Sequence, residues 1–72
     1  MAKATIRNEI RRLRFEHGEM TQQELADRVG CSRQTIIMLE QERYAPSLLL
    51  ALRIAEVFST TVEAIFRLEG TG

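Results

Sequence analysis

Residues 21–41 have the sequence TQQELADRVGCSRQTIIMLEQ, and this stretch decides the fold. Thr21 is followed three residues later by Glu24, the spacing of a capping box at the start of a helix. Gly30 readily takes the left-handed conformation that ends a helix, and Ser32, separated from it only by Cys31, is a good N-cap for the next helix. The stretch therefore predicts two short helices joined by a tight turn, the arrangement called helix-turn-helix.

The sequence before this motif has helical periodicity. Ile6, Ile10 and Leu13 occupy positions i, i+4 and i+7, which places them on one face of a helix. A first helix is therefore expected over about residues 5–17, with Gly18 ending it.

The sequence after the motif predicts two further helices. Ser47 can cap a fourth helix that runs through Phe58. Thr60 or Thr61 can cap a short fifth helix through Phe66. Five helices are thus expected, the third of them beginning after Ser32.

Length and composition indicate one ordinary globular domain. The chain has 72 residues, of which 44% are hydrophobic and 28% are charged. Hardly any stretch alternates with a period of two, so the expected fold class is all-α, with a single domain over residues 5–68 and a flexible tail over residues 69–72.

No apolar run approaches the roughly 18 residues of a membrane span, and no signal peptide is visible. A cytoplasmic location without a membrane partner is expected.

No pattern in the sequence indicates catalysis or a cofactor. Cys31 is the single cysteine and His17 the single histidine. An internal disulfide cannot form, and no cluster of Cys and His metal ligands is present in the sequence. No nucleophile with a base and no suitably spaced pair of carboxylates is visible. We expect no enzymatic activity, no metal, no cofactor and no small-molecule ligand.

The charge is balanced overall but not along the chain. Ten Lys and Arg match ten Asp and Glu, which argues against nucleic acid because DNA-binding domains usually have an excess of positive charge. Residues 1–14, however, hold five basic residues and only one acidic residue, Glu9. One basic face can therefore still meet a phosphate backbone, with a strong dependence on salt.

The third helix has side chains that suit DNA recognition. At about 100° per residue, Ile36 and Leu39 face the core. The opposite side bears Arg33, Gln34, Ile37, Met38 and Gln41. Arg and Gln near a helix N-terminus can form paired hydrogen bonds with guanine and adenine edges in the major groove. Double-stranded DNA is therefore the expected partner.

The motif at residues 21–41 resembles the helix-turn-helix of Cro and cI-type phage repressors, the xenobiotic-response-element (XRE) family. The sequence LR at Leu13 and Arg14 precedes it, and YAPSLLLALRIAEVFSTTVEAIF at residues 44–66 is similar to the last two helices of the family's five-helix, lambda-repressor-like domain. The resemblance implies a sequence-specific, DNA-binding transcriptional regulator. Repression is expected, because no second domain is visible that could sense a ligand or recruit polymerase.

The resemblance also implies which residues bind. Gln22 would contact a phosphate and brace the recognition helix. Arg43 and Tyr44 match the loop that touches the DNA backbone beyond that helix. Arg14 and Glu40 occupy the places of a structural ion pair. The positions that meet bases or adjacent phosphates hold Ser32, Arg33, Gln34, Thr35, Ile37 and Met38.

This chain departs from the family pattern at several positions. It is one residue longer before the motif, so an irregular turn is expected around residues 17–20. Glu42 stands where the family usually has Gly after the third helix. Ile37 and Met38 replace residues that are commonly polar, and Leu49 stands where the family is often charged.

These apolar residues leave a second function open. Ile37 and Met38 can contact thymine methyl groups or be covered by another protein chain. The alternative is a protein-interaction module, or an antitoxin-like partner, that uses both residues together with Leu49. For DNA binding, one module contacts too few base pairs to be specific, so a homodimer is expected through the fourth and fifth helices, between Leu49 and Leu68.

Overall fold

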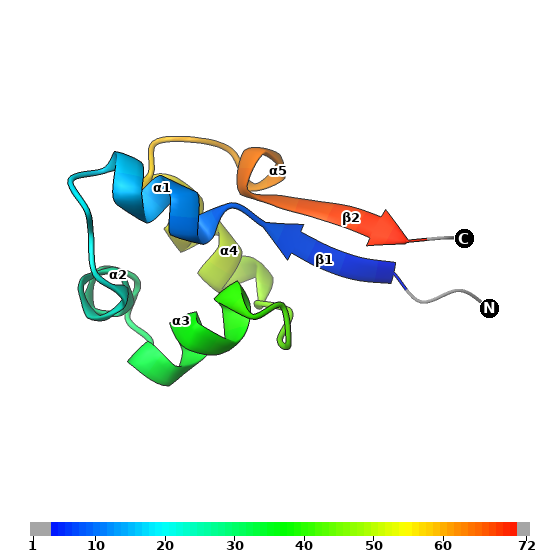
Figure 1. The fold of residues 1–72 in the computed structure, drawn as a ribbon, viewed down its shortest axis with the longest axis horizontal. Coiled ribbons are helices and arrows are strands. Elements are labelled where there is room, and N and C mark those ends of the chain that lie inside the picture. Colours follow the sequence, from blue (N-terminus) through cyan, green and yellow to red (C-terminus); the bar gives the residue numbers. More distant parts are fainter. Residues whose placement is uncertain (1–3, 71–72) are drawn as a thin grey trace.

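The computed structural model describes residues 4–70 as a bundle of helices with a two-stranded arm (Figure 1). In chain order the elements are β1 (Ala4–Asn8), α1 (Ile10–Glu16), α2 (Gln22–Val29), α3 (Arg33–Glu40), α4 (Leu48–Val57), α5 (Val62–Ile65) and β2 (Phe66–Gly70). The arm extends from one side of the bundle and includes the first and last described residues. No helix within residues 4–70 combines the length and the apolar character needed to cross a membrane.

The helix ends follow the capping chemistry of the sequence. The hydroxyl of Thr21 accepts the backbone N–H of Glu24 at 3.0 Å, and the Glu24 carboxylate accepts the N–H of Thr21 at 3.0 Å, so the predicted capping box is confirmed. Gly30 ends α2 in the left-handed conformation, with a φ of 77°. Hydroxyl caps also begin the three later helices, at Ser32, Ser47 and Thr61.

One hydrophobic core joins all five helices of the described chain. Its largest fully buried side chains are Ile10, Leu25, Ile36, Leu39, Ile54 and Ile65, and every helix supplies at least one. Burying a side chain of this size stabilises a protein by about 1.5–3 kcal/mol. The shared core therefore fixes the helices relative to one another, including α3 on its inner face.

The prediction of an all-α fold was wrong at the two ends of the domain. β1 and β2 form an antiparallel pair in which Ile6 lies opposite Leu68. Residues 5–8 therefore lie in a strand, and α1 begins only at Ile10. Glu69 and Gly70, which were expected in a flexible tail, belong to β2, whereas residues 71–72 lie outside the described residues.

The error has a physical cause in the distance between the strands along the chain. Arg7 and Glu69, which contact each other across the sheet, are 62 positions apart, so local periodicity contains no sign of their pairing. Ile6 and Ile10 have helical spacing, but Asn8 lies between them and its side-chain oxygen accepts the backbone N–H of Ile10 at 3.2 Å. Asn8 is the last residue of β1, and Glu9 follows it as the N-cap residue of α1, so this bond lies where the chain changes from strand to helix.

Candidate nucleic-acid interface

The two helices of the motif present the N-terminal end of α3 to solvent. Ile36 and Leu39 of α3 are buried against the core, at 0% and 1% exposure. Ser32, Arg33 and Gln34, which begin the helix, are exposed on the other side. The first turn of α3 is therefore accessible to a partner while its inner face is held in place.

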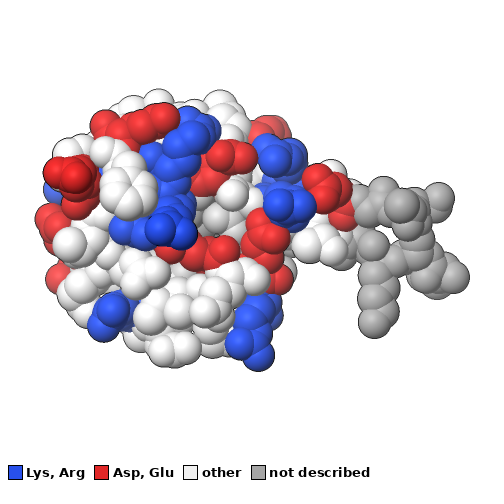
Figure 2. Space-filling view, in the orientation of Figure 1, with Lys and Arg blue, Asp and Glu red and all other residues white. Residues whose placement is uncertain are grey.

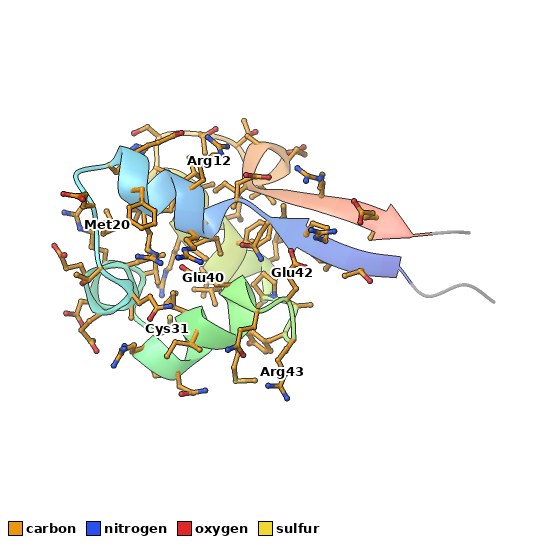
Figure 3. The ribbon with its side chains drawn as sticks, viewed as in Figure 1. Arg12, Met20, Cys31, Glu40, Glu42 and Arg43 are labelled. Carbon is orange, nitrogen blue, oxygen red and sulfur yellow. The ribbon has the colours of Figure 1, made fainter. Side chains whose placement is uncertain are left out.

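A hydrogen-bonded network, here called the inner brace, links α1, α2 and α3. It consists of Arg14, Gln22 and Glu40. The Nε and Nη2 atoms of Arg14 donate to the two carboxylate oxygens of Glu40 at 2.7 and 3.1 Å. Gln22 Nε2 also donates to Glu40, at 3.1 Å, and Arg14 Nη1 donates to the Met20 carbonyl at 2.8 Å. Figure 3 shows Glu40 between α1 and α3.

The inner brace is nearly closed to solvent, since the Arg14 and Glu40 side chains are only 11% and 10% exposed. A carboxylate in such a place is stable because both of its oxygens are bonded to a cation or an amide. The structure thus brings together the two residues expected to form an ion pair, and Gln22, which was expected to brace the recognition helix, donates to the same carboxylate. Their contacts fix the last turn of α3 relative to the other two helices.

A groove lies beside the inner brace, with walls formed by residues of α1, α2 and α3. Most of the residues that line it are of polar or charged types, with Phe15 and Ile37 as the apolar exceptions: Asn8, Arg11, Arg14, Phe15, Thr21, Gln22, Gln23, Arg33, Ile37, Glu40 and Gln41. Sequence analysis did not select Arg11, Phe15 or Gln23. Phe15 is 55% exposed, and the guanidinium carbons of Arg11 and Arg14 both lie 5.9 Å from its ring centroid. Arg11 and Arg14 are three positions apart in the sequence, and this helical spacing is the signal that could have indicated that they lie on one face of α1.

Ile37 and Met38 of α3 are less exposed than residues on the solvent side of a helix would be. Ile37 and Met38 are partly exposed, as is Thr35, and Ile37 lines the groove. Leu49 is 59% exposed and lies on α4, and Leu48 and Leu52 beside it are 71% and 52% exposed. Of the three apolar residues expected on the surface, only Leu49 is thus more than half exposed, and two further exposed leucines lie beside it on α4.

The chain leaves α3 through a turn in which Glu42 adopts a φ of 61°, in the left-handed region. The N–H of Glu42 donates to the Leu39 carbonyl at 2.9 Å, and the N–H of Arg43 donates to the Met38 carbonyl at 3.1 Å. These two bonds make a Schellman motif, which usually has Gly at the left-handed position. The turn places Arg43 and Tyr44 on the surface, where both are exposed.

Basic side chains lie over α1 and at both ends of α3 in Figure 2, with acidic side chains between them. Among the ion pairs within residues 4–70, none uses Arg11, Arg33 or Arg43. These three charges are therefore available to an anionic partner: Arg11 and Arg33 line the groove, and Arg43 is exposed just beyond the end of α3.

Cys31, in the turn between the motif helices, is partly buried, and burial raises the pKa of its thiol. The thiolate is therefore disfavoured, which fits a packing role in the turn.

Comparisons with known proteins agree with this geometry. A family model described as helix-turn-helix matches residues 10–65, from the start of α1 to the end of α5. An uncharacterized HTH-type transcriptional regulator of Methanothermobacter thermautotrophicus is 53% identical over 68 residues, which cover 93% of this chain and 97% of that protein. Another, of Archaeoglobus fulgidus, is 49% identical over 61 residues, 85% of this chain and 86% of the relative. The uncharacterized HTH-type transcriptional regulator YgzD of Bacillus subtilis is 42% identical over 64 residues, 89% and 96% of the two chains.

Proposed function

The chain belongs to the XRE-type helix-turn-helix family, and on this premise we propose that it is a DNA-binding transcriptional regulator that inserts α3 into the major groove. The observation that supports this most is the state of the first turn of α3. Ser32, Arg33 and Gln34 are exposed there, while the core and the inner brace hold the opposite side of the helix. Side chains that bind base edges need this combination of access and rigid support.

Contacts to the DNA backbone would flank this helix. Gln22 begins α2 and keeps one amide N–H for a phosphate, because Nε2 has two N–H groups and donates one of them to Glu40. Arg43 and Tyr44 are exposed just beyond the other end of α3. To these we add Arg11, which lines the groove between the helices. Contacts on both sides of α3 would fix its register in the groove without reading sequence themselves.

Repression by occupying a promoter is the proposed outcome, with the protein acting as a homodimer on two half-sites about one DNA turn apart. The exposed leucines of α4 support a dimer, because three large apolar side chains within its first two turns favour burial in an interface. They extend the proposed surface, which also includes α5 and Leu68, toward the start of α4.

The same leucines favour a second candidate function, a protein-interaction module. Leu48, Leu49 and Leu52 would dock a different protein in that case. Ile37 gives this alternative little support, because it is partly buried and lines the polar groove.

Selection of bound sequences from a random pool of double-stranded DNA, at two salt concentrations, separates the two candidates. A regulator should enrich one sequence, arranged as an inverted repeat if two copies bind, and its affinity should fall as salt rises. Enrichment of no sequence at either salt concentration would contradict the proposed function and favour the interaction module.

A further inference from the structure

Two consecutive side chains of β1 form hydrogen bonds with the end of α3 and the turn that follows it. Asn8 Nδ2 donates to the Leu39 carbonyl at 2.7 Å. Arg7 Nε donates to the Glu42 carboxylate at 2.9 Å, and Arg7 Nη1 donates to Glu69 of β2 at 2.8 Å. The contacts of Arg7 with Glu42 and Glu69, here called the outer clamp, connect both strands to the turn that follows α3.

The turn after α3 requires a conformation that Glu42 does not favour. At a φ of 61°, the Cβ atom of an L-residue crowds its own carbonyl, which is why Gly is usual at this position of a Schellman motif. In this conformation of the turn, however, the carboxylate of Glu42 forms an ion pair with Arg7. Figure 3 shows Glu42 on the side of β1 and Arg43 directed away from the strand.

We propose that Arg7 is a positioning residue for DNA binding, which holds Glu42 in the left-handed turn and thereby aims Arg43 and Tyr44 at the DNA backbone. This inference rests on the proposed function. The sheet supplies the anchor, because Glu69 of β2 bonds the same guanidinium and limits its movement. In this chain the outer clamp does the work that Gly does elsewhere through its intrinsic freedom.

A double-mutant cycle tests the mechanism, with Arg7→Ala, Glu42→Gly and their combination measured against the selected DNA. Arg7→Ala should weaken binding about three- to tenfold, because the turn then spends less time in the competent conformation. Glu42→Gly should bind within about twofold of the wild type, since Gly accepts the positive φ unaided. In the Glu42→Gly background, Arg7→Ala should cause almost no further loss.

Arg67→Ala is the matched control. Arg67 lies on the other strand of the same sheet, directly opposite Arg7, but its guanidinium pairs with Glu9 and not with the turn after α3. Removing this charge should leave the DNA affinity within about twofold of the wild type. Circular dichroism verifies the folding of each variant. If Arg7→Ala does not fold, Glu42→Gln, which weakens only the contact with the turn, should show the same loss of affinity.

A second measurement needs no DNA and therefore separates this inference from the proposed function. Hydrogen exchange of the Arg43 amide, which bonds the Met38 carbonyl, should accelerate in Arg7→Ala and return toward the wild-type rate when Glu42→Gly is added. Unchanged exchange in Arg7→Ala would overturn the inference even if the wild type binds DNA. Equal losses of affinity in both backgrounds would also overturn it, because they would mean that Arg7 contacts a phosphate directly.

Discussion

Two arginine–glutamate contacts hold the end of α3, and they differ in almost every other respect. The inner brace joins Arg14 to Glu40, with both side chains about nine-tenths buried. The outer clamp joins Arg7 to Glu42, whose side chains are 43% and 26% exposed. The first lies within the segment that matches the family model, residues 10–65, whereas Arg7 lies outside it.

This difference in burial indicates two different roles: the inner brace stabilises the fold, and the outer clamp orients the turn after α3. A buried pair that loses one member leaves an uncompensated charge in the interior, which is strongly destabilising. An exposed pair contributes little to stability, because water and salt screen it. The outer clamp can therefore change the direction of one turn at small cost to the fold, and the inner brace cannot be altered without damage to the whole domain.

The largest expected effect is on the inner brace. Arg14→Ala should lower the free energy of unfolding by about 3 kcal/mol or more, because Glu40 then remains buried with only Gln22 as a partner. Arg7→Ala and Arg12→Ala, which remove exposed ion-paired arginines, serve as controls and should change stability far less. Urea unfolding followed by circular dichroism measures all three. Equal losses of stability would show that burial does not distinguish the two contacts.

A smaller loss of stability is expected at low pH, where protonation removes the charge of exposed carboxylates such as that of Glu24. The pKa of Glu24 is lowered because its carboxylate accepts the backbone N–H of Thr21, and the neighbouring hydroxyl adds to the shift. A lowered folded pKa means that the capping box stabilises the fold above the ordinary value of 4.5, and that this stability disappears as the pH falls through the lowered pKa.

Glu24→Gln isolates that contribution, because the amide oxygen can still accept the Thr21 N–H but does not titrate. Stability measured by thermal unfolding between about pH 6 and pH 3 should fall less steeply in this variant than in the wild type. Identical slopes would show that Glu24 gains nothing from its charge in the folded state.

The sequence allowed three helix caps of the motif to be predicted, because Thr21, Gly30 and Ser32 act on residues next to them, but it did not show how α3 ends. Ser47 did the same for α4. The strands escaped prediction because Ile6 and Leu68 pair across almost the whole length of the chain, so nothing near either residue in the sequence indicates the partner.

The candidate site shows the same division. Arg33 and Gln34 could be predicted from helical periodicity and from the resemblance, and the structure places them on the exposed start of α3. Arg11 and Phe15 join the site only through the packing of α1 beside the motif. The contact of Arg7 with Glu42 depends on the sheet and has no local signal at all.

The central claim, that the start of α3 recognises bases while its far end meets the backbone, is tested most directly by repeating the DNA selection with Arg33→Ala and Arg43→Ala. Arg33→Ala should lose discrimination at one base pair in each half-site, by about 1–3 kcal/mol, while the rest of the selected sequence stays the same. Arg43→Ala should keep the selected sequence, weaken all binding alike and reduce the slope of affinity against salt by about one. An unchanged sequence preference in Arg33→Ala, or an altered one in Arg43→Ala, would contradict the account.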